Sequence, residues 1–352
     1  MTRTGRENNF VVLRLCAAIM VISGHMANLM LISVPMLFQR NVHALGVYIF
    51  FMIGGYLITK SWMSDPHPVR YAVKRFMRIW PPLAVFVLFA AFVAGPLLST
   101  FSVQEYFLSG GWKYYLWNIA LYIMYSLPGV FTGNPYPNAV NGSLWTLPVE
   151  AAMYIVVPLL LTLCAAESKT RRSKTCIVLF TALVCILDGC LLAFFPDARL
   201  VFYGTDWVSA LHNIPFYLIG VVCAVIDIRR YLSLQVAMVL VLLLSCMKMN
   251  YVKMQFVLYA ALPYLVFSLA FTPQAIFSKL NQKAEISYGM YLYGFFIQQC
   301  VMAVSTRMGW QIEFMTALVI SCIFTVGIAY ASYYLVERPA QKLCSRILEK
   351  CR

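Results

Sequence analysis

Ten apolar runs, most of them near the length that a helix needs to cross a bilayer, follow one another along this 352-residue chain. Continuous apolar runs predict membrane-spanning helices, because a transmembrane strand would alternate apolar and polar residues. Charged residues make up 11% of the chain, well below the roughly 25% of a soluble domain. The sequence therefore predicts an all-α, polytopic helical bundle. The runs occupy residues 10–34, 44–63, 77–98, 143–164, 175–195, 208–227, 232–248, 253–272, 286–306 and 313–336.

Lys and Arg are unevenly distributed between the segments that connect these runs. If the N-terminus lies inside, 21 of the 27 Lys and Arg residues fall on the inner side and six on the outer side. Cytoplasmic loops of membrane proteins carry this excess of positive charge. We therefore expect ten spans in the cytoplasmic (inner) membrane, with both termini cytoplasmic. The net charge of +14 follows from this topology, and we predict no nucleic-acid partner.

One apolar stretch, Tyr114 to Leu127, is too short to count as a crossing. Its 14 residues suit an interfacial or re-entrant helix within the outer loop 99–142. Counting it as a span would place the Lys169–Lys174 cluster and the C-terminal tail outside, against the charge rule. We expect one transmembrane domain over residues 1–340 and a short basic cytoplasmic tail over 341–352.

Arg14 and His25 lie on one helical run, so His25 sits about 16 Å deeper in the membrane than Arg14. Polar groups at such depth are costly and often functional. A neutral imidazole can take a hydroxyl proton and return it near neutral pH. The alternative is that His25 only forms a hydrogen bond between helices.

A second candidate is Glu150, in the segment from Asn141 to Tyr154. The predicted span places its carboxylate at a depth similar to that of His25, so Glu150 could orient the imidazole as the acid of a catalytic triad does. A helix-packing hydrogen bond is the alternative. Asp188, midway along another span, is a buried acid without an obvious partner in the sequence.

Arg75 and Arg78 are a third candidate, at the inner end of the third run. Residues three apart share a helix face, and guanidinium groups suit bidentate contacts with phosphate. The two arginines therefore predict an anion site, although membrane anchoring by positive charge would also explain them. No CxxC pair or zinc spacing is present in the sequence, and we predict no metal site.

Taken together, six short motifs resemble those of the acyltransferase family 3 membrane proteins, and the resemblance covers almost the whole chain. The motifs are Arg14-x10-His25, Gly46-Val-Tyr-Ile-Phe50-Phe51-Met-Ile-Gly-Gly55-Tyr56-Leu-Ile, Arg75-x-x-Arg78-Ile-x-Pro81, Gly142-Ser143-Leu-Trp145-Thr-Leu-x-x-Glu150, Phe216-x-x-x-Gly220 and Ser287-Tyr288-x-x-Tyr291-Leu. Two positions depart from the family pattern: Gly54 replaces a frequent Ser, and Tyr293 stands where many members have a histidine.

The resemblance implies an integral membrane O-acyltransferase with no bound cofactor. It moves an acyl group, acetyl by default, from cytoplasmic acyl-CoA to a hydroxyl of a cell-surface or exported carbohydrate, such as O-antigen of lipopolysaccharide or an exopolysaccharide. The acceptor is then a carbohydrate or lipid-linked glycan, and the other partners are membrane lipids. We assign His25 and Glu150 to catalysis and Arg14, Arg75 and Arg78 to acyl-CoA binding. The candidate substrate-binding residues are Ser143, Trp145, Tyr288 and Tyr291.

Two other classes of function remain open from the residues alone. A small-molecule transporter would also show many spans, midplane polar residues and proline-interrupted helices such as the one with Pro148 and Pro158. A membrane scaffold or receptor would leave His25 and Glu150 as packing residues. Paired arginines on one inner face favour the enzyme, because a transporter does not need them.

Overall fold

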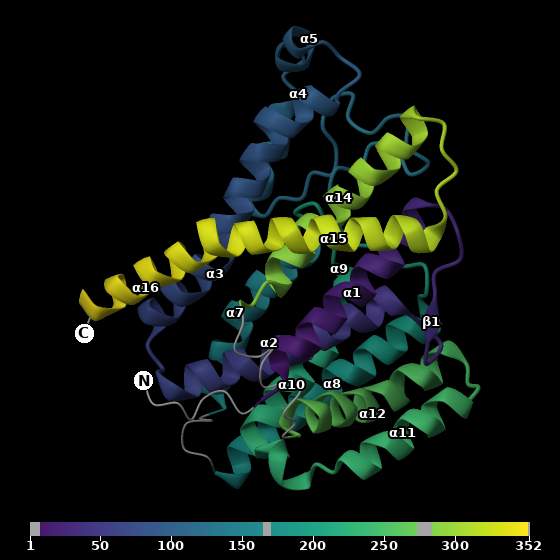
Figure 1. Cartoon of the computed structure of the whole chain (residues 1–352). Coiled ribbons are helices and arrows are strands. Elements are labelled where there is room, and N and C mark those ends of the chain that lie inside the picture. The colour runs from purple at the N-terminus through teal and green to yellow at the C-terminus, as the bar shows by residue number, and fades with distance from the viewer. Residues whose placement is uncertain (1–7, 165–169, 273–283, 351–352) are drawn as a thin grey trace.

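The computed structural model describes residues 8–164, 170–272 and 284–350, and these residues are almost entirely helical (Figure 1). Six of the Lys and Arg residues counted for the topology lie outside the described residues: Arg3, Arg6, Lys169, Lys279, Lys283 and Arg352. The longer helices are α1 (Phe10–Leu29), α2 (Val42–Ser64), α3 (Pro68–Phe89), α7 (Thr146–Leu163), α8 (Arg171–Phe194), α10 (Ile214–Ile226), α11 (Leu234–Cys246), α12 (Tyr251–Phe271), α14 (Ser287–Arg307), α15 (Phe314–Ser332) and α16 (Arg338–Lys350).

Within the described ranges, eight helical segments are long and apolar enough to cross a membrane. They include every predicted span except 232–248 and 286–306. Those two are also helical, as the 13-residue α11 and the 21-residue, less apolar α14. The predicted all-α polytopic membrane fold is confirmed.

The third predicted span begins nine residues earlier than expected. Its helix starts at Pro68, because the His67 side chain accepts a hydrogen bond from the Arg70 backbone N–H and proline suits the first helical turn. The helix then continues through the π-helix Ala90–Ala94 and α4 (Gly95–Leu98). One continuous rod therefore carries Arg75 and Arg78 at its start and reaches the far end of the bundle (Figure 1).

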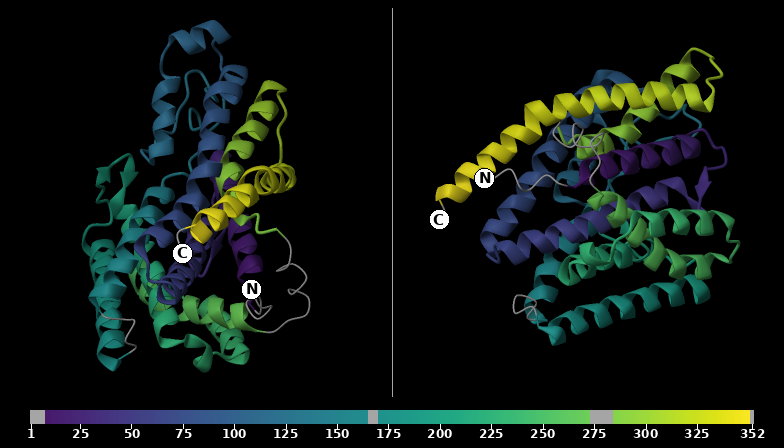
Figure 2. Two further views of the ribbon diagram at one scale, coloured as in Figure 1. Left: turned by 90° about the vertical axis from the view of Figure 1, so that its left-hand side faces the viewer. Right: turned by 60° about the horizontal axis from the view of Figure 1, so that its bottom comes forward.

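The centre of the bundle is α2, which lies between α1 and α10. Its contact with α10 is made by backbone atoms, since a Cβ on Gly55 would lie 2.0 Å from the Tyr217 carbonyl oxygen. A Cβ on Gly220 would likewise lie 2.2 Å from the Met52 carbonyl oxygen. Small residues allow this close approach between membrane helices, and Figure 2 shows the two helices running along each other.

The segment 99–142 holds only short helices, as α5 (Val103–Leu108), α6 (Trp112–Tyr115) and a 3₁₀-helix (Leu116–Ala120). The helix expected over Tyr114–Leu127 ends at Ala120. There the Asn118 side chain donates hydrogen bonds to the carbonyl oxygens of Tyr115 and Met124 and accepts one from the Met124 N–H. Side chains of this type compete with helical hydrogen bonding, so the chain turns instead.

Two tight hairpins and one short helix complete the fold. The strands β1 (Met36–Leu37) and β2 (Arg40–Asn41) pair antiparallel between α1 and α2, and β3 (Val201–Phe202) and β4 (Thr205–Asp206) pair antiparallel between α8 and α9 (Trp207–Leu211). A 3₁₀-helix (Ile228–Tyr231) joins α10 to α11.

The predicted basic tail is the end of a long helix. The helix α15 continues through the π-helix Tyr333–Glu337 into α16, which packs against α3. Ala340 and Cys344 of α16 are buried. The described part of the tail is therefore packed onto the bundle, while the domain boundary at residue 340 stays a prediction.

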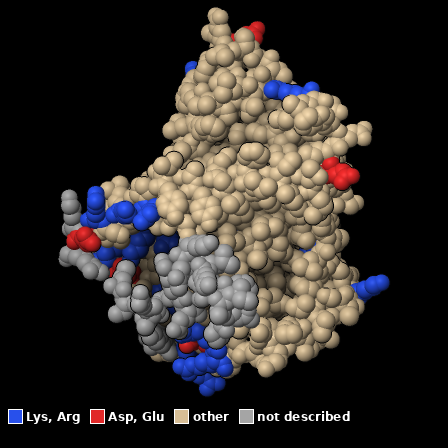
Figure 3. Space-filling view, viewed as in Figure 1, with Lys and Arg blue, Asp and Glu red and all other residues tan. Residues whose placement is uncertain are grey.

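Lys and Arg gather at one end of the molecule, where α16 lies beside the start of α3 (Figure 3). We call this the basic end; its described residues include Arg14, Arg70, Lys74, Arg75 and Arg78. The opposite end, formed by the segments 30–41, 99–142, 195–206 and 308–313, is called the loop end. Which end faces the cytoplasm stays a prediction.

Candidate active site

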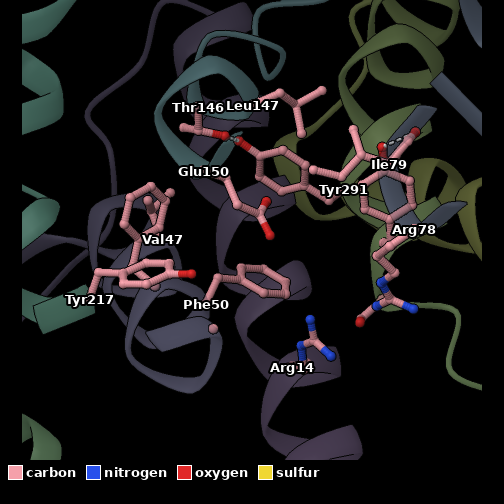
Figure 4. Close-up of a pocket in the computed structure, with 14 residues that line it drawn as sticks. Arg14, Val47, Phe50, Arg78, Ile79, Thr146, Leu147, Glu150, Tyr217 and Tyr291 are labelled. Carbon is pink, nitrogen blue, oxygen red and sulfur yellow. Dashed lines mark hydrogen bonds between the residues drawn. The ribbon is translucent and has the colours of Figure 1, made fainter. Parts of the chain in front are cut away.

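A cavity of about 50 Å³ lies in the bundle, between α1, α2, α3, α7, α10 and α14 (Figure 4). We call it the arginine cavity. Its volume has room for no more than a few water molecules. The lining residues are Arg14, Val47, Phe50, Phe51, Gly54, Arg78, Ile79, Thr146, Leu147, Glu150, Tyr217, Ser287, Tyr288 and Tyr291.

A carboxylate that the sequence analysis did not identify, Glu285, joins the two arginines of this cavity. Its Oε1 lies 3.0 Å from Nη2 of Arg78 and also accepts a hydrogen bond from Arg14. Burial raises the pKa of Glu285, but the positive charges of Arg14 and Arg78 outweigh this effect and hold the pKa at about 2. Glu285 therefore carries a negative charge and occupies the position that an external anion would take between the two guanidinium groups.

Arg75 and Arg78 lie one turn apart on α3, as their spacing predicts, but they line different cavities. The Arg75 guanidinium lies 5.6 Å from the ring centre of Tyr71 and 5.8 Å from that of Tyr154, in cation–π contacts. It lines an apolar cavity of about 730 Å³ between α2, α3 and α7. Its Nε is buried and has no hydrogen-bond partner among the described residues. Of the three arginines predicted to bind the donor, Arg14 and Arg78 thus share one cavity and Arg75 lies in another.

Glu150 points into the arginine cavity (Figure 4). Its carboxylate accepts a hydrogen bond from the hydroxyl of Tyr154, one turn further along α7. Residues four apart on a helix are neighbours, so this local partner is always within reach of Glu150.

His25 lies in a different cavity, of about 880 Å³, at the loop end. We call it the histidine cavity. The imidazole stacks on His43 at 5.7 Å between ring centres, and the Phe295 ring meets it edge-on at 5.3 Å. His25 makes no hydrogen bond to any residue that the structure describes.

The predicted contact between His25 and Glu150 is therefore wrong for this structure. Glu150 lines the arginine cavity together with Arg14 and Arg78, whereas His25 lines the histidine cavity at the loop end. The Glu150 carboxylate is bonded instead to the Tyr154 hydroxyl. The ring of His25 instead lies between two aromatic side chains, His43 and Phe295.

The four candidate substrate-binding residues divide into two pairs. Tyr288 and Tyr291 line the arginine cavity, and the Tyr291 hydroxyl donates a 2.8 Å hydrogen bond to the Ser143 carbonyl oxygen. The side chains of Ser143 and Trp145 do not line this cavity. Ser143 is buried, with its N–H bonded to the Asn141 side chain at 3.0 Å, so the structure gives it a role in shaping the turn before α7.

Asp188, which has no obvious partner in the sequence, has two partners in the structure. Its carboxylate lies 2.5 Å from Nδ1 of His212 and also accepts a hydrogen bond from the Tyr259 hydroxyl. These residues belong to α8, to the junction of α9 and α10, and to α12. None of the three lines the arginine cavity or the histidine cavity, so the cluster ties three helices together away from both.

Three contact partners of the candidate site residues were not predicted from the sequence: Glu285, His43 and Tyr154. Signals in the sequence point to the first two. Two arginines within a membrane bundle need a counter-ion, and Glu285 stands directly before the run that contains Tyr288. His43 lies three residues before Gly46, and Gly46 is the first residue of one of the six motifs.

Comparison with known proteins identifies the family. A family model described as an acyltransferase domain matches residues 8–334. A nodulation protein 10 of Rhizobium leguminosarum bv. viciae is 27% identical, covering 99% of this chain and 96% of the relative. An O-acetyl transferase of Shigella phage Sf6 is 28% identical, covering 95% and 96% respectively. The peptidoglycan O-acetyltransferase OatA of Listeria monocytogenes serovar 1/2a is 25% identical, covering 46% of this chain and 27% of the relative.

No solved structure matches the chain significantly. The family match extends over both cavities and confirms the enzyme prediction over the transporter alternative. With its helical bundle of membrane-spanning length, the chain belongs to acyltransferase family 3 and is a membrane-embedded acyltransferase.

Proposed function

We propose that this protein transfers an acetyl group from acetyl-CoA to a hydroxyl of a cell-surface or exported carbohydrate. The observation that carries the proposal is the placement of Arg14 and His25 on one helix, α1, each in its own cavity. Along the helix axis they are about 16 Å apart. One rigid element thus holds a cation site at one end and a potential proton acceptor at the other.

The donor fits the basic end, which we place at the cytoplasmic face of the inner membrane. CoA carries several phosphate charges, and guanidinium groups bind phosphate in bidentate fashion. The free volume of about 50 Å³ is too small for the thioester arm, so donor binding has to widen the arginine cavity and displace Glu285 from Arg14 and Arg78.

The chemistry assigned to His25 is proton transfer. The imidazole accepts the proton of the acceptor hydroxyl while the oxygen attacks the thioester carbonyl, and the tetrahedral adduct then expels the CoA thiolate, which takes up the proton. In a second route, the His25 nitrogen attacks the thioester carbonyl and expels the CoA thiolate, which gives an acyl-His25 intermediate. The acceptor hydroxyl then attacks this acyl group, neutral imidazole leaves, and the hydroxyl proton passes to the CoA thiolate. Both routes need His25 in its neutral form.

Two relatives support the acetyl group and the hydroxyl acceptor, since their names state O-acetyl transfer. One of them is named for peptidoglycan, a carbohydrate polymer. For this chain we propose the same reaction class, with a glycan as the acceptor.

The test is transfer of radiolabel from acetyl-CoA to glycan in isolated membranes. Loss of general-base catalysis typically costs about a hundred- to ten-thousand-fold in rate, so His25→Ala should reduce kcat by this factor while the KM for acetyl-CoA stays near that of the wild type. His67→Asn is the matched control, because Asn can still cap α3 and residue 67 lies outside both cavities. Normal labelling by His25→Ala would refute the catalytic assignment.

A further inference from the structure

The histidine cavity has a chemical character unlike that of the arginine cavity. Its volume of about 880 Å³ falls within the range of small-molecule sites. None of its described lining residues is Lys, Arg, Asp or Glu. A cavity without fixed charge does not favour the phosphates of CoA. It favours an uncharged ligand.

The mouth of this cavity combines aromatic rings with neutral polar groups. Tyr125 and Tyr136 are 40% and 44% exposed. The exposed amide side chains of Asn28, on α1, and Asn138, on the loop, line the same cavity. His25 is only half-buried and lines the cavity with them. A pyranose ring has an apolar C–H face that packs on an aromatic ring and a rim of hydroxyls that bond amide and phenol groups.

The loop that carries Tyr136 is held in place by a fully buried side chain, Gln299 of α14. The Gln299 Nε2 donates hydrogen bonds to the carbonyl oxygens of Tyr136, at 3.0 Å, and Ala139, at 2.8 Å. In return the Asn134 side chain donates to the Gln299 side-chain oxygen at 2.7 Å. The loop therefore keeps its shape without a ligand, which lowers the entropy cost of binding one.

The opposite wall is fixed from the same helix. Gln298, also fully buried, donates a 2.6 Å hydrogen bond to the Ile22 carbonyl oxygen, one turn before His25 on α1. Neighbouring residues of α14 thus hold both the loop with Tyr136 and the helix with His25. These hydrogen bonds fix the backbone that carries Tyr136 relative to the backbone that carries His25.

We propose that the histidine cavity binds one pyranose ring of the acceptor, with Tyr136 and Tyr125 against its apolar face and one ring hydroxyl directed to His25. The proposal rests on the proposed function, because it takes the acceptor to be a carbohydrate. It assigns acceptor recognition to the loop 125–139, at the far end of α1 from the cation site.

The test is direct binding of methyl pyranosides to the purified full-length protein in detergent, measured by saturation-transfer NMR. The probes are the methyl glycosides of glucose, galactose, rhamnose and N-acetylglucosamine, with sorbitol as an open-chain polyol that lacks a ring face. The wild type should give signals from the ring protons of at least one pyranoside and weaker signals from sorbitol. Loss of one stacking contact should raise the dissociation constant about tenfold in Tyr136→Ala, and Tyr136→Phe should bind nearly as the wild type.

The matched control is Tyr122→Ala. Tyr122 is 39% exposed and lies in the same segment, but it packs on Tyr203 and does not line the histidine cavity. Equal binding by Tyr136→Ala and the wild type, or no pyranoside signal from the wild type, overturns the proposed site. Glycan labelling from acetyl-CoA by membranes with the wild-type protein is measured in parallel. If the binding test fails and labelling is present, the acyltransfer proposal stands without this site. If labelling is absent, the acyltransfer proposal itself fails.

Discussion

Glu285 and Arg78 lie 3.0 Å apart, and the same carboxylate oxygen accepts a hydrogen bond from Arg14. The three side chains are each less than one third exposed, so their charges are only partly screened by solvent. The internal carboxylate neutralises part of the charge that an anionic donor would meet. It would therefore compete with the proposed acyl-CoA donor for the same two guanidinium groups.

Replacing Glu285 by Gln should tighten donor binding. The neutral amide leaves both guanidinium groups available to phosphate, and one charge-assisted hydrogen bond of about 1.5–3 kcal/mol corresponds to a KM for acetyl-CoA lower by roughly tenfold or more. Steady-state kinetics on purified protein measures this, with Glu313→Gln at the loop end as the control. An unchanged or higher KM would show that Glu285 orients the arginines for the donor and does not compete with it.

Protonation of the Glu285 carboxylate should lower the stability of the folded protein in acid. Its pKa is lowered from 4.5 to about 2 in the folded state, so the stabilisation is fully present above pH 4.5 and is lost as the pH falls toward 2. Thermal unfolding in detergent should therefore show a higher Tm for the wild type than for Glu285→Gln at about pH 6, and this difference should shrink below pH 4.5. A difference that stays constant over this range would contradict the ion-pair assignment.

The two arginines of α3 should differ in their effect on the donor. Arg78→Ala removes a guanidinium that lines the arginine cavity and should raise the KM for acetyl-CoA about tenfold, as expected for one lost charged contact. Arg75→Ala removes a side chain that lies over Tyr71 and Tyr154 in another cavity and should raise the KM by less than about threefold. If Arg75→Ala has the larger effect, the donor phosphates lie in the apolar cavity beside α7.

His43 should support catalysis through the stacking of its ring on His25. Stacking between aromatic rings contributes about 0.5–1.5 kcal/mol, so loss of the ring in His43→Ala should lower kcat about threefold to tenfold by loosening His25. His43→Phe keeps a flat ring and should retain most of kcat, with the KM for acetyl-CoA unchanged in both variants. If His43→Phe is as impaired as His43→Ala, the imidazole nitrogens of His43 take part and stacking alone is not its role.

Much of the fold could be predicted from the sequence, because length and apolarity are sufficient to identify a helix that crosses a membrane. All ten predicted spans coincide with helices. The boundaries that differ depend on single side chains. Asn118 ends one predicted helix through three hydrogen bonds, and the His67 cap starts another before its apolar run begins.

The candidate site was harder to predict, because its pairs are far apart in the chain. Glu285 bonds Arg14 across 271 positions, and no local pattern indicates such a partner. Asp188 finds His212 across 24 positions and a helix junction. Position along a predicted span does not give the cavity that a side chain lines: Glu150 lies with Arg14 in the arginine cavity, and His25 lies in the histidine cavity.

The backbone contact between α2 and α10 limits where the proposed thioester donor could enter the bundle. With no space for a methyl group at Gly55 or Gly220, the two backbones are in direct contact, and this contact leaves no gap between them for a ligand to enter. Phe50 on α2 and Tyr217 on α10 therefore form one closely packed wall of the arginine cavity. If acyl-CoA is the donor, we expect it to enter by displacement of α3 or α14, the helices that bring Arg78 and Tyr288 to this cavity.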